Sequence, residues 1–450
     1  MPGGSSLGMS ALRLPNLFAR GHSRKFSGLL DEPDKYDKLS SRRLAGGARR
    51  WTILRMLRWA AATAGLGVVL FLWTYEVHVE VQLFSRGWVR RAILPVEPLS
   101  STCFDPDHIA STPYNTSLAN APAYVDVHAG LAMPLGRDCY NFAATLPRRP
   151  LPDMVLAAHT VFHTYWRHDL LPLGQRQVSL LHSILATQDR ASTSVVLWTN
   201  APSPSALSDL PILRPLLDLY GDRLSIRSVD KHMLAQGTPM EAHPLLDMAD
   251  RQAWVDGDLV RILVLYALGG VWVDFDTIMT GRDVRVLGEH EWVTQWDCYD
   301  KKYQPLNGAM MHFHRASPYL CEMLHTMATS PPPARNSVDW GSRLYHKVWR
   351  SLVARGITPF KVLPFCFTDG VSCRLDNRLP DPFADPRGSE RRWGQGRWDD
   401  VQSKVASVWA VHLHNRWDKA FPSGGWVDEM VLKPVEARVE LYRQGLDGAD

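Results

Sequence analysis

The chain has 450 residues, of which 45% are hydrophobic and 21% are charged, as in ordinary folded proteins with a large core. Residues 1–58 hold twelve Lys or Arg against four Asp or Glu, a local charge of +8, so the net charge of +4 leaves −4 for the remainder. A basic character confined to one end argues against nucleic acid as the partner of the main body.

The N-terminal 75 residues combine a basic tail with an apolar segment. Residues 1–50 are polar and rich in Gly, Ser and Arg, which predicts a mostly disordered tail. Residues 51–75 supply the roughly 20 apolar residues that a bilayer needs if Arg55 and Arg58 reach the interface. A buried core helix is the alternative, but the Arg-rich flank "SRRLAGGARR" favours a membrane span. The excess of positive charge before the span predicts a type II signal anchor with a cytosolic tail.

All six cysteines lie after this segment, which predicts an oxidising compartment. No pair has the CxxC spacing of a zinc site. Cys366 and Cys373 bracket the loop "CFTDGVSC", which a disulfide could close, and the other pairings do not follow from the sequence. The sequon "NTS" at Asn115 is a glycosylation acceptor and agrees with a lumenal location, which we place in the Golgi membrane.

The rest of the chain divides into a stem and a catalytic domain. Residues 76–150 are rich in Pro, Ser and Asn and show little periodicity, which predicts a stem. Residues 151–450 have the pattern of an α/β domain, with a polar insertion near 380–400. Buried strands are predicted within "DMVLAAHTVFHTYW", "TSVVLWTN" and "RLSIRSVD", and a helix in "RQVSLLHSILATQD". Strands alternating with helices predict a mostly parallel sheet.

The centre of the domain carries two acids directly after an apolar run. Residues 254–268 have helical spacing and stop at a Gly pair, and "VWVDF" follows as a buried strand. Asp274 and Asp276 project to the same side if the strand continues to Phe275. They then reach the carboxyl edge of the sheet, where open α/β sheets bind ligands. Two carboxylates there favour Mg²⁺ or Mn²⁺ shared with phosphate oxygens, although a bare DxD is most often a pair of solvated acids.

The longer pattern "DLVRILVLYALGGVWVDFD" resembles the DXD-containing glycosyltransferase family 32, nearest to the α-1,4-galactosyltransferase/α-1,4-N-acetylglucosaminyltransferase type. The segments "PLNGAMMHFHRASPYLCEM" and "VWAVHLHNRW" extend the resemblance, which covers about residues 155–435. It implies a GT-A fold, a single mostly parallel Rossmann-like sheet flanked by helices. It also implies a nucleotide-sugar donor (a UDP- or GDP-sugar) held through Mn²⁺ or Mg²⁺, a glycan or glycolipid acceptor, and transfer with retention of anomeric configuration.

The resemblance also implies roles for the central residues. Asp274 and Asp276 would bind the metal and act in catalysis. Asp258 and Arg261, three residues apart on one helix face, would grip the donor sugar. The adjoining pair Gly269 and Gly270 belongs to the same donor-binding motif.

Each candidate residue outside the central motif has two interpretations. His412 is a candidate third metal ligand, or a packed histidine. Asn307 is a candidate for the reacting face of the sugar, or part of an Asn-Gly turn. His163 and Trp166 in "FHTYW", and Trp198 with Asn200 in "LWTN", could bind the donor nucleotide or belong to an aromatic core.

Two other classes of protein compete with a transferase. A haloacid-dehalogenase-type phosphatase also uses DxD after a strand, but it needs Thr or Val where this chain has Ile278, and its motif opens the domain. The other is a non-catalytic, membrane-anchored carbohydrate-binding protein on a degenerate transferase fold. The chain retains the four central residues of the motif, which argues against such decay: Asp258, Arg261, Asp274 and Asp276.

Overall fold

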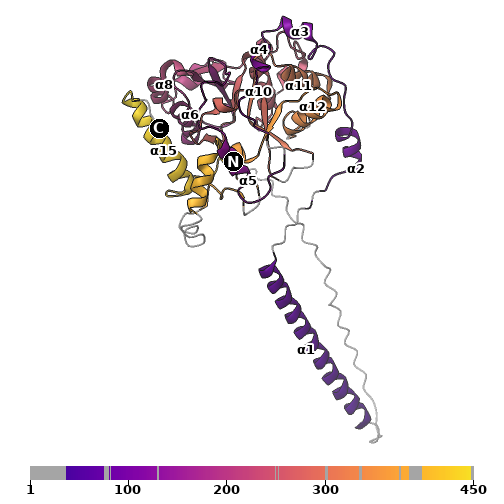
Figure 1. Cartoon of the computed structure of the whole chain (residues 1–450). Helices are drawn as coiled ribbons and strands as arrows, with labels where there is room; N and C mark the ends of the chain where they lie inside the picture. The colour runs from indigo at the N-terminus through magenta and orange to yellow at the C-terminus, as the bar shows by residue number, and fades with distance from the viewer. Residues whose placement is uncertain are drawn as a thin grey trace, which may run out of the picture. The chain divides into compact units, whose positions relative to one another are not determined.

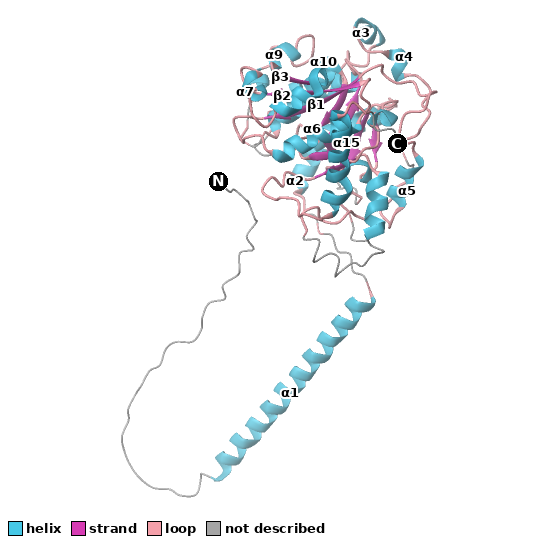
Figure 2. Cartoon of the chain, turned by 90° about the vertical axis from the view of Figure 1, so that its left-hand side faces the viewer, coloured by secondary structure: helices cyan, strands magenta, loops and turns pink. Residues whose placement is uncertain are grey.

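The computed structural model describes residues 37–75, 81, 83–128, 131–248, 250–251, 253–298, 303–333, 337–373, 377–384 and 398–446. The chain forms two compact units, Met1–Leu83 and Phe84–Asp450. Helices surround the strands of the second unit (Figure 1, Figure 2).

The described part of the first unit is dominated by one long helix, α1 (Asp37–Thr74). Its segment Trp51–Thr74 spans 24 residues with a mean hydropathy of 1.5, and none of its apolar window is buried. That segment is long and apolar enough to cross a membrane, and it lacks the burial of a core helix. Residues 37–50, expected to be disordered, have a helical backbone, while residues 1–36 lie outside the described part.

The second unit is built on a seven-stranded sheet, which confirms the expected fold class, a mostly parallel central sheet flanked by helices. The strand order is β3-β2-β1-β4-β7-β6-β8, and β7 alone runs antiparallel to its neighbours. The strands are β1 (Thr160–Trp166), β2 (Thr193–Thr199), β3 (Leu224–Ser228), β4 (Gly270–Val273), β6 (Trp292–Gln295), β7 (Leu306–Phe313) and β8 (Lys361–Leu363). A second, two-stranded sheet pairs β5 (Thr277–Met279) with β9 (Ala410–His412) in antiparallel register.

Two hydrophobic cores lie on the two faces of the large sheet. Alternation along β4 sends Val271 and Val273 into one core and Trp272 into the other. The first core packs α6 (Gln175–Thr187) and the second packs α10 (Val255–Leu268), α11 (Pro318–Thr329) and α12 (Ser342–Ala354). Figure 1 shows α10, α11 and α12 grouped together, with α6 beside α15 (Lys433–Arg443). Helix α10 is buried on most of its surface, which accounts for its predominantly apolar sequence apart from Asp256, Asp258 and Arg261.

Most of the expected stem, residues 84–150, belongs to the same compact unit as the sheet. Disulfides Cys103–Cys321 and Cys139–Cys366 join this segment to the sheet domain, and Cys298–Cys373 is the third bond. The expectation that Cys366 pairs with Cys373 is therefore wrong. Cys366 opens the short helix α13 (Cys366–Asp369) and is buried against α5 (Asp138–Thr145), which carries Cys139. Of the expected polar insertion, residues 385–397 lie outside the described part.

Candidate functional site

A cavity of about 340 Å³ opens at the carboxyl ends of β1 and β4. Because β7 is antiparallel to β4, its beginning meets the end of β4 at the same edge of the sheet. Trp166 therefore reaches the cavity from β1, Asp274 from the end of β4 and Asn307 from the start of β7. The binding edge predicted for an open α/β sheet is thus lined by polar and aromatic side chains.

The two acids of the DxD motif follow β4 in a turn. β4 ends at Val273, so the expectation that both acids project from one strand is wrong in detail. The amide of Asp274 still donates to the carbonyl of Ala309 on β7 (2.7 Å), and the amide of Thr277 donates to the carbonyl of Asp274 (3.0 Å), which closes the turn. Both acids nonetheless line the cavity, as does Phe275, most of whose surface is buried.

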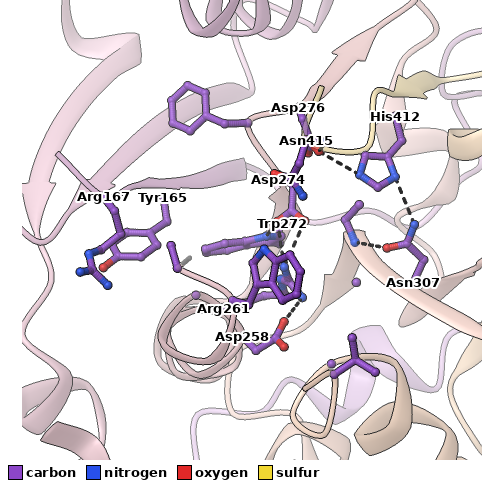
Figure 3. A pocket seen from close by; sticks show the side chains of 18 of the residues that line it. Tyr165, Arg167, Asp258, Arg261, Trp272, Asp274, Asp276, Asn307, His412 and Asn415 are labelled. Atoms are coloured by element: carbon purple, nitrogen blue, oxygen red, sulfur yellow. Dashed lines mark hydrogen bonds and ion pairs between the residues drawn. The ribbon is translucent and has the colours of Figure 1, made fainter. Parts of the chain in front are cut away.

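Arg261 links the helix to the first acid. One terminal nitrogen of Arg261 donates to Asp258 (2.8 Å) and to the hydroxyl of Tyr345 (2.8 Å), and the other donates to both oxygens of Asp274 (2.9 and 3.1 Å). The indole of Trp272 adds a third hydrogen bond to Asp274 (2.6 Å). The predicted pairing of Asp258 with Arg261 is present. Figure 3 shows Arg261 between the two carboxylates.

Burial changes the acidity of this group. Burial raises the pKa of Asp258 to about 6, although the positive charge of Arg261 opposes that shift. The guanidinium of Arg261 stays protonated throughout the physiological pH range. Asp258 and Arg261 both line the cavity, and both side chains are largely buried.

Two glycines make room for this ion pair. A Cβ on Gly308 would lie 2.3 Å from a terminal nitrogen of Arg261 and 2.5 Å from the Tyr345 hydroxyl. A Cβ on Gly341 would lie 2.9 Å from a carboxylate oxygen of Asp258. Gly308 follows Asn307 in the predicted Asn-Gly segment, so its signal was visible in the sequence. No spacing along the chain marks Gly341 as a contact of Asp258.

The second acid faces a histidine from the small sheet. Asp276 is 3% exposed, and its Oδ2 lies 3.3 Å from Nε2 of His412. The backbone amide of Asn415 donates to the same oxygen (2.6 Å). Burial alone would raise the pKa of Asp276, but His412 and the amide of Asn415 lower it. Asp276 in turn raises the pKa of His412 well above its ordinary value, against the effect of burial.

Asp274, Asp276 and His412 together form a candidate metal centre. One ligand atom from each lies within 4.8 Å of the others. Two carboxylate oxygens and one imidazole nitrogen, with room on the cavity side, suit a divalent metal ion. Asp276 and His412 are buried while Asp274 is partly exposed, so the centre is open toward the cavity. The three residues predicted as ligands from the sequence are brought together.

Asn307 lies in strand β7 and not in a turn. Its side-chain oxygen accepts from the amide of Ala309 (2.9 Å), and its nitrogen lies 3.2 Å from both Asp369 and the Nδ1 of His412. Asn307 lines the cavity, but its amide is already bonded at both ends. This arrangement favours a positioning role for Asn307.

The other predicted donor-binding residues divide into two groups. Trp166 lines the cavity, where its ring meets Phe275 and Trp417 edge to face (5.4 and 5.5 Å). The cavity lining does not include the remaining five: His163, Trp198, Asn200, Gly269 and Gly270.

Four of them, His163, Trp198, Gly269 and Gly270, pack behind the cavity. The indole of Trp198 donates to Nδ1 of His163 (3.2 Å), and Nε2 of His163 meets the carbonyl of Gly269 (2.9 Å), which matches the alternative of a packed core. Burial lowers the pKa of His163 to about 4. A Cβ on Gly270 would lie 2.3 Å from the carbonyl oxygen of Val161, so this glycine permits close backbone approach.

One end of the cavity carries residues that the sequence did not single out. Arg167 donates to Asp256 (2.9 Å) and forms a two-bond pair with Asp169, and the hydroxyl of Tyr165 also donates to Asp256 (3.1 Å). Asn200 binds Asp169 (2.6 Å) and so supports this cluster from outside the cavity lining. A single sequence offers no spacing that would join β1 to the start of α10.

Comparison with known proteins gives remote structural similarities. No family model matches the chain, and no curated protein matches it. It is similar to a structure named "PaToxG Glycosyltransferase", with 12% identity over 69% of this chain and 91% of that chain and a TM-score of 0.33.

Two further solved structures have similar scores. "WbbM bifunctional glycosytransferase apo structure" is 10% identical over 65% of this chain, with a TM-score of 0.36, and this chain spans about half (51%) of its length. The glycosyltransferase domain of the YGT toxin is 9% identical over 55% of this chain and 88% of its own, with a TM-score of 0.30. These structures are named as glycosyltransferases, and at such scores the likeness alone assigns no activity to this chain.

Proposed function

We propose that this chain is a metal-dependent glycosyltransferase that moves a sugar from a UDP- or GDP-sugar to a glycan or glycolipid acceptor, with retention. The observation that carries the proposal is the meeting of Asp274, Asp276 and His412 at the carboxyl edge of the sheet, beside the Asp258–Arg261 pair. A diphosphate needs a divalent cation and a sugar needs hydrogen-bonding groups, and this cavity offers both kinds of partner.

The proposed metal would be held by Asp274, Asp276 and His412. Bound there, Mn²⁺ or Mg²⁺ supplies Lewis-acid stabilisation of the charge that develops on the diphosphate leaving group. Arg261 and the indole of Trp272 hold the carboxylate of Asp274 by three hydrogen bonds. Such fixed ligands need little rearrangement when charge develops.

The donor sugar fits the neighbouring part of the cavity. The carboxylate of Asp258 lines the cavity and can accept a hydrogen bond from a sugar hydroxyl. The aromatic side chains Trp254, Trp272 and Trp417 line the same cavity and offer apolar surface to a sugar ring. A volume of about 340 Å³ lies within the usual range of small-molecule sites.

The cellular setting is part of the proposal. The apolar segment Trp51–Thr74 would anchor the chain as a type II Golgi protein, with the second unit in the lumen. Three disulfides and an exposed Asn115 in its sequon support an oxidising, glycosylating compartment.

The structure gives no support to the phosphatase alternative. The side chain of Ile278, which stands where that class needs Thr or Val, is buried in the core. Asp276 pairs with His412 from another sheet, an arrangement that suits a metal ligand.

The test is transfer by the full-length chain in detergent with a panel of UDP- and GDP-sugars, with and without Mn²⁺. We expect nucleotide release that requires the metal. Asp274→Asn and Asp276→Asn keep volume but remove charge, and each should lower the rate roughly a thousandfold or more, because several kcal/mol of leaving-group stabilisation is lost.

The matched control is Asp222→Asn, because Asp222 is exposed and lies outside the cavity. The control should transfer at the wild-type rate. Near wild-type transfer by either site variant without added metal would refute the metal centre. Sugar binding with no nucleotide release from any donor would instead favour the carbohydrate-binding alternative.

A further inference from the structure

A buried carboxylate lies directly behind the candidate metal centre. Asp369, the last residue of α13, has no exposed surface and does not line the cavity. Its Oδ2 lies 3.3 Å from Nδ1 of His412 and 3.2 Å from the side-chain nitrogen of Asn307. Its Oδ1 lies 2.8 Å from Nε2 of His414. One carboxylate therefore contacts three side chains around the site.

The contacts of His412 indicate which ring nitrogen keeps its proton when a metal binds. An ionised carboxylate only accepts hydrogen bonds, so a ring nitrogen facing it must donate. Nδ1 faces Asp369 (3.3 Å) and Nε2 faces Asp276 (3.3 Å), so both nitrogens donate in the metal-free chain. The side-chain nitrogen of Asn307, 3.2 Å from both Asp369 and Nδ1, is itself a donor and is satisfied by Asp369. A metal bound beside Asp276 would replace the proton on Nε2, whereas Asp369 would keep the proton on Nδ1.

We propose that Asp369 is a positioning residue that fixes the tautomer and ring orientation of His412 so that Nε2 can bind the metal. This inference rests on the proposed metal site and deepens it. A carboxylate behind a metal-binding histidine restrains the ring and makes the ligand more basic, and losing it commonly weakens metal binding 10- to 100-fold.

The backbone around Asp369 is firmly held. The disulfide Cys139–Cys366 anchors the first residue of α13, and the amide of Asp369 donates to the carbonyl of Phe365 (2.8 Å). The amide of Trp409, just before β9, donates to the carbonyl of Phe367 on α13 (3.0 Å). Asp369 and the strand that carries His412 are therefore fixed to each other.

Backbone pairing also sets the distance between His412 and the DxD motif. His412 of β9 pairs with Thr277 of β5, the residue that follows Asp276. The amide of Leu413 donates to the carbonyl of Asp276 (2.7 Å). The ladder places the two residues side by side but leaves the imidazole free to rotate about its side-chain bonds. Asp369 restricts this rotation from the Nδ1 side of the ring, opposite the contact between Nε2 and Asp276.

The experiment is a double-mutant cycle on Mn²⁺ affinity, measured on the full-length chain by the paramagnetic resonance signal of free Mn²⁺, without sugar donor or acceptor. We expect Asp369→Asn to weaken Mn²⁺ binding 10- to 100-fold. His412→Ala should weaken it at least as much. The double variant should bind no more weakly than His412→Ala, because Asp369 acts through that ring. Asp222→Asn is the control and should bind as the wild type does.

Wild-type Mn²⁺ affinity in folded Asp369→Asn would overturn the inference, and so would an equal loss in the His412→Ala background. If Asp369→Asn fails to fold, ring-¹⁵N NMR spectra of the wild-type chain with Mg²⁺ provide the test instead. The His412 signal is assigned as the one that is missing from the spectrum of His412→Ala. We expect a protonated Nδ1, and a bare Nδ1 would overturn the inference. Unchanged Mn²⁺ affinity in His412→Ala would show that His412 is not a metal ligand, which contradicts the proposed metal site as well. If His412→Ala loses Mn²⁺ affinity and Asp369→Asn does not, only the role of Asp369 is refuted.

Discussion

Arg261 is a buried guanidinium between two carboxylates that come from different elements. It donates to Asp258 on its own helix and to Asp274 after β4, and its carbon lies 5.4 Å from the ring centre of Trp272. A planar fork can serve both carboxylates at once, whereas an ammonium group is a point charge on a flexible stem. Arg261 therefore couples the proposed sugar-binding acid to the proposed metal ligand.

We predict that Arg261→Lys lowers transfer at least a hundredfold although the charge is kept, because Lys cannot hold both carboxylates in the same geometry. The measurement is the initial rate at saturating donor. The matched control is Arg443→Lys, because Arg443 forms an exposed ion pair with Glu440 on α15. This variant should keep its activity. Near-normal turnover in Arg261→Lys would remove Arg261 from the site.

Gly308 permits the approach of Arg261 to Tyr345. An added methyl group would overlap both side chains, and overpacking of a dense site typically costs about 1–3 kcal/mol. We predict that Gly308→Ala displaces Arg261, lowers transfer at least tenfold and lowers the midpoint of thermal unfolding. Gly87→Ala, where the nearest atom is 3.4 Å away on the flexible Arg91, should change neither quantity. Wild-type values in Gly308→Ala would show that the site adapts.

At the scale of single residues, the sequence identifies the site where spacing along the chain carries the geometry. Asp258 and Arg261 are one helical turn apart, and Asp274 and Asp276 follow the same strand, so their proximity follows from local structure. Asp369 carries no such signal: its contacts to Asn307 and His412 arise from the packing of α13 against β7 and β9. His163 and Trp198 failed as donor contacts because they bond each other in the core.

Strand β6 is joined to the segment before the sheet by a buried acid. Glu291, one residue before β6, accepts from the hydroxyl of Tyr114 (2.8 Å) and from the amide of His314 (3.0 Å). Burial raises the pKa of Glu291 to about 7, although these hydrogen bonds act in the opposite direction. The ionised form is therefore disfavoured in the folded chain relative to the unfolded chain.

This shift has a defined pH dependence. Because the pKa of Glu291 is higher in the folded chain than in the unfolded chain, protonated Glu291 adds to the free energy of unfolding. This contribution is fully present below about pH 4.5, the unfolded pKa, and is lost as the pH rises through about 7, the folded pKa. We predict that Glu291→Gln, which cannot ionise, gains in unfolding midpoint relative to the wild type between pH 4.5 and pH 8. Thermal unfolding at both pH values is the measurement. The exposed Glu436→Gln should show no such trend, and a constant difference for Glu291→Gln would contradict the prediction.

The presence of a helix or strand was easier to predict from the sequence than its first and last residues. Helix α10 follows the expected segment closely, because its apolar pattern and the Gly pair mark its ends. The first strand was expected from residue 153 but begins at Thr160, where pairing with Thr193 of β2 starts. Asn307 and Gly308 read as a turn in isolation, yet they lie in β7, because pairing to β4 and β6 overrides the local preference.

The proposed arrangement of the chain across a membrane rests on its first unit. The segment Trp51–Thr74 is the apolar helix, Arg-rich sequence precedes it and every disulfide follows it. We predict that protease added to sealed microsomes removes the N-terminal tail but leaves residues 84–450 intact, and that detergent makes them cleavable. Digestion of the second unit without detergent would refute the proposed topology. An epitope on the tail serves as the internal control for protease activity.

The disulfides also impose an order on biosynthesis. With the proposed topology, Cys103 and Cys139 would enter the oxidising compartment 218 and 227 residues before their partners. At about 5–20 residues per second, translation alone separates the members of each pair by roughly 10–45 seconds. Throughout that interval both thiols stay open to wrong partners or to a thiol-disulfide isomerase. The carboxylate behind His412 lies on α13, whose first residue is Cys366, so the proposed metal centre would be completed only after most of the polypeptide has been made.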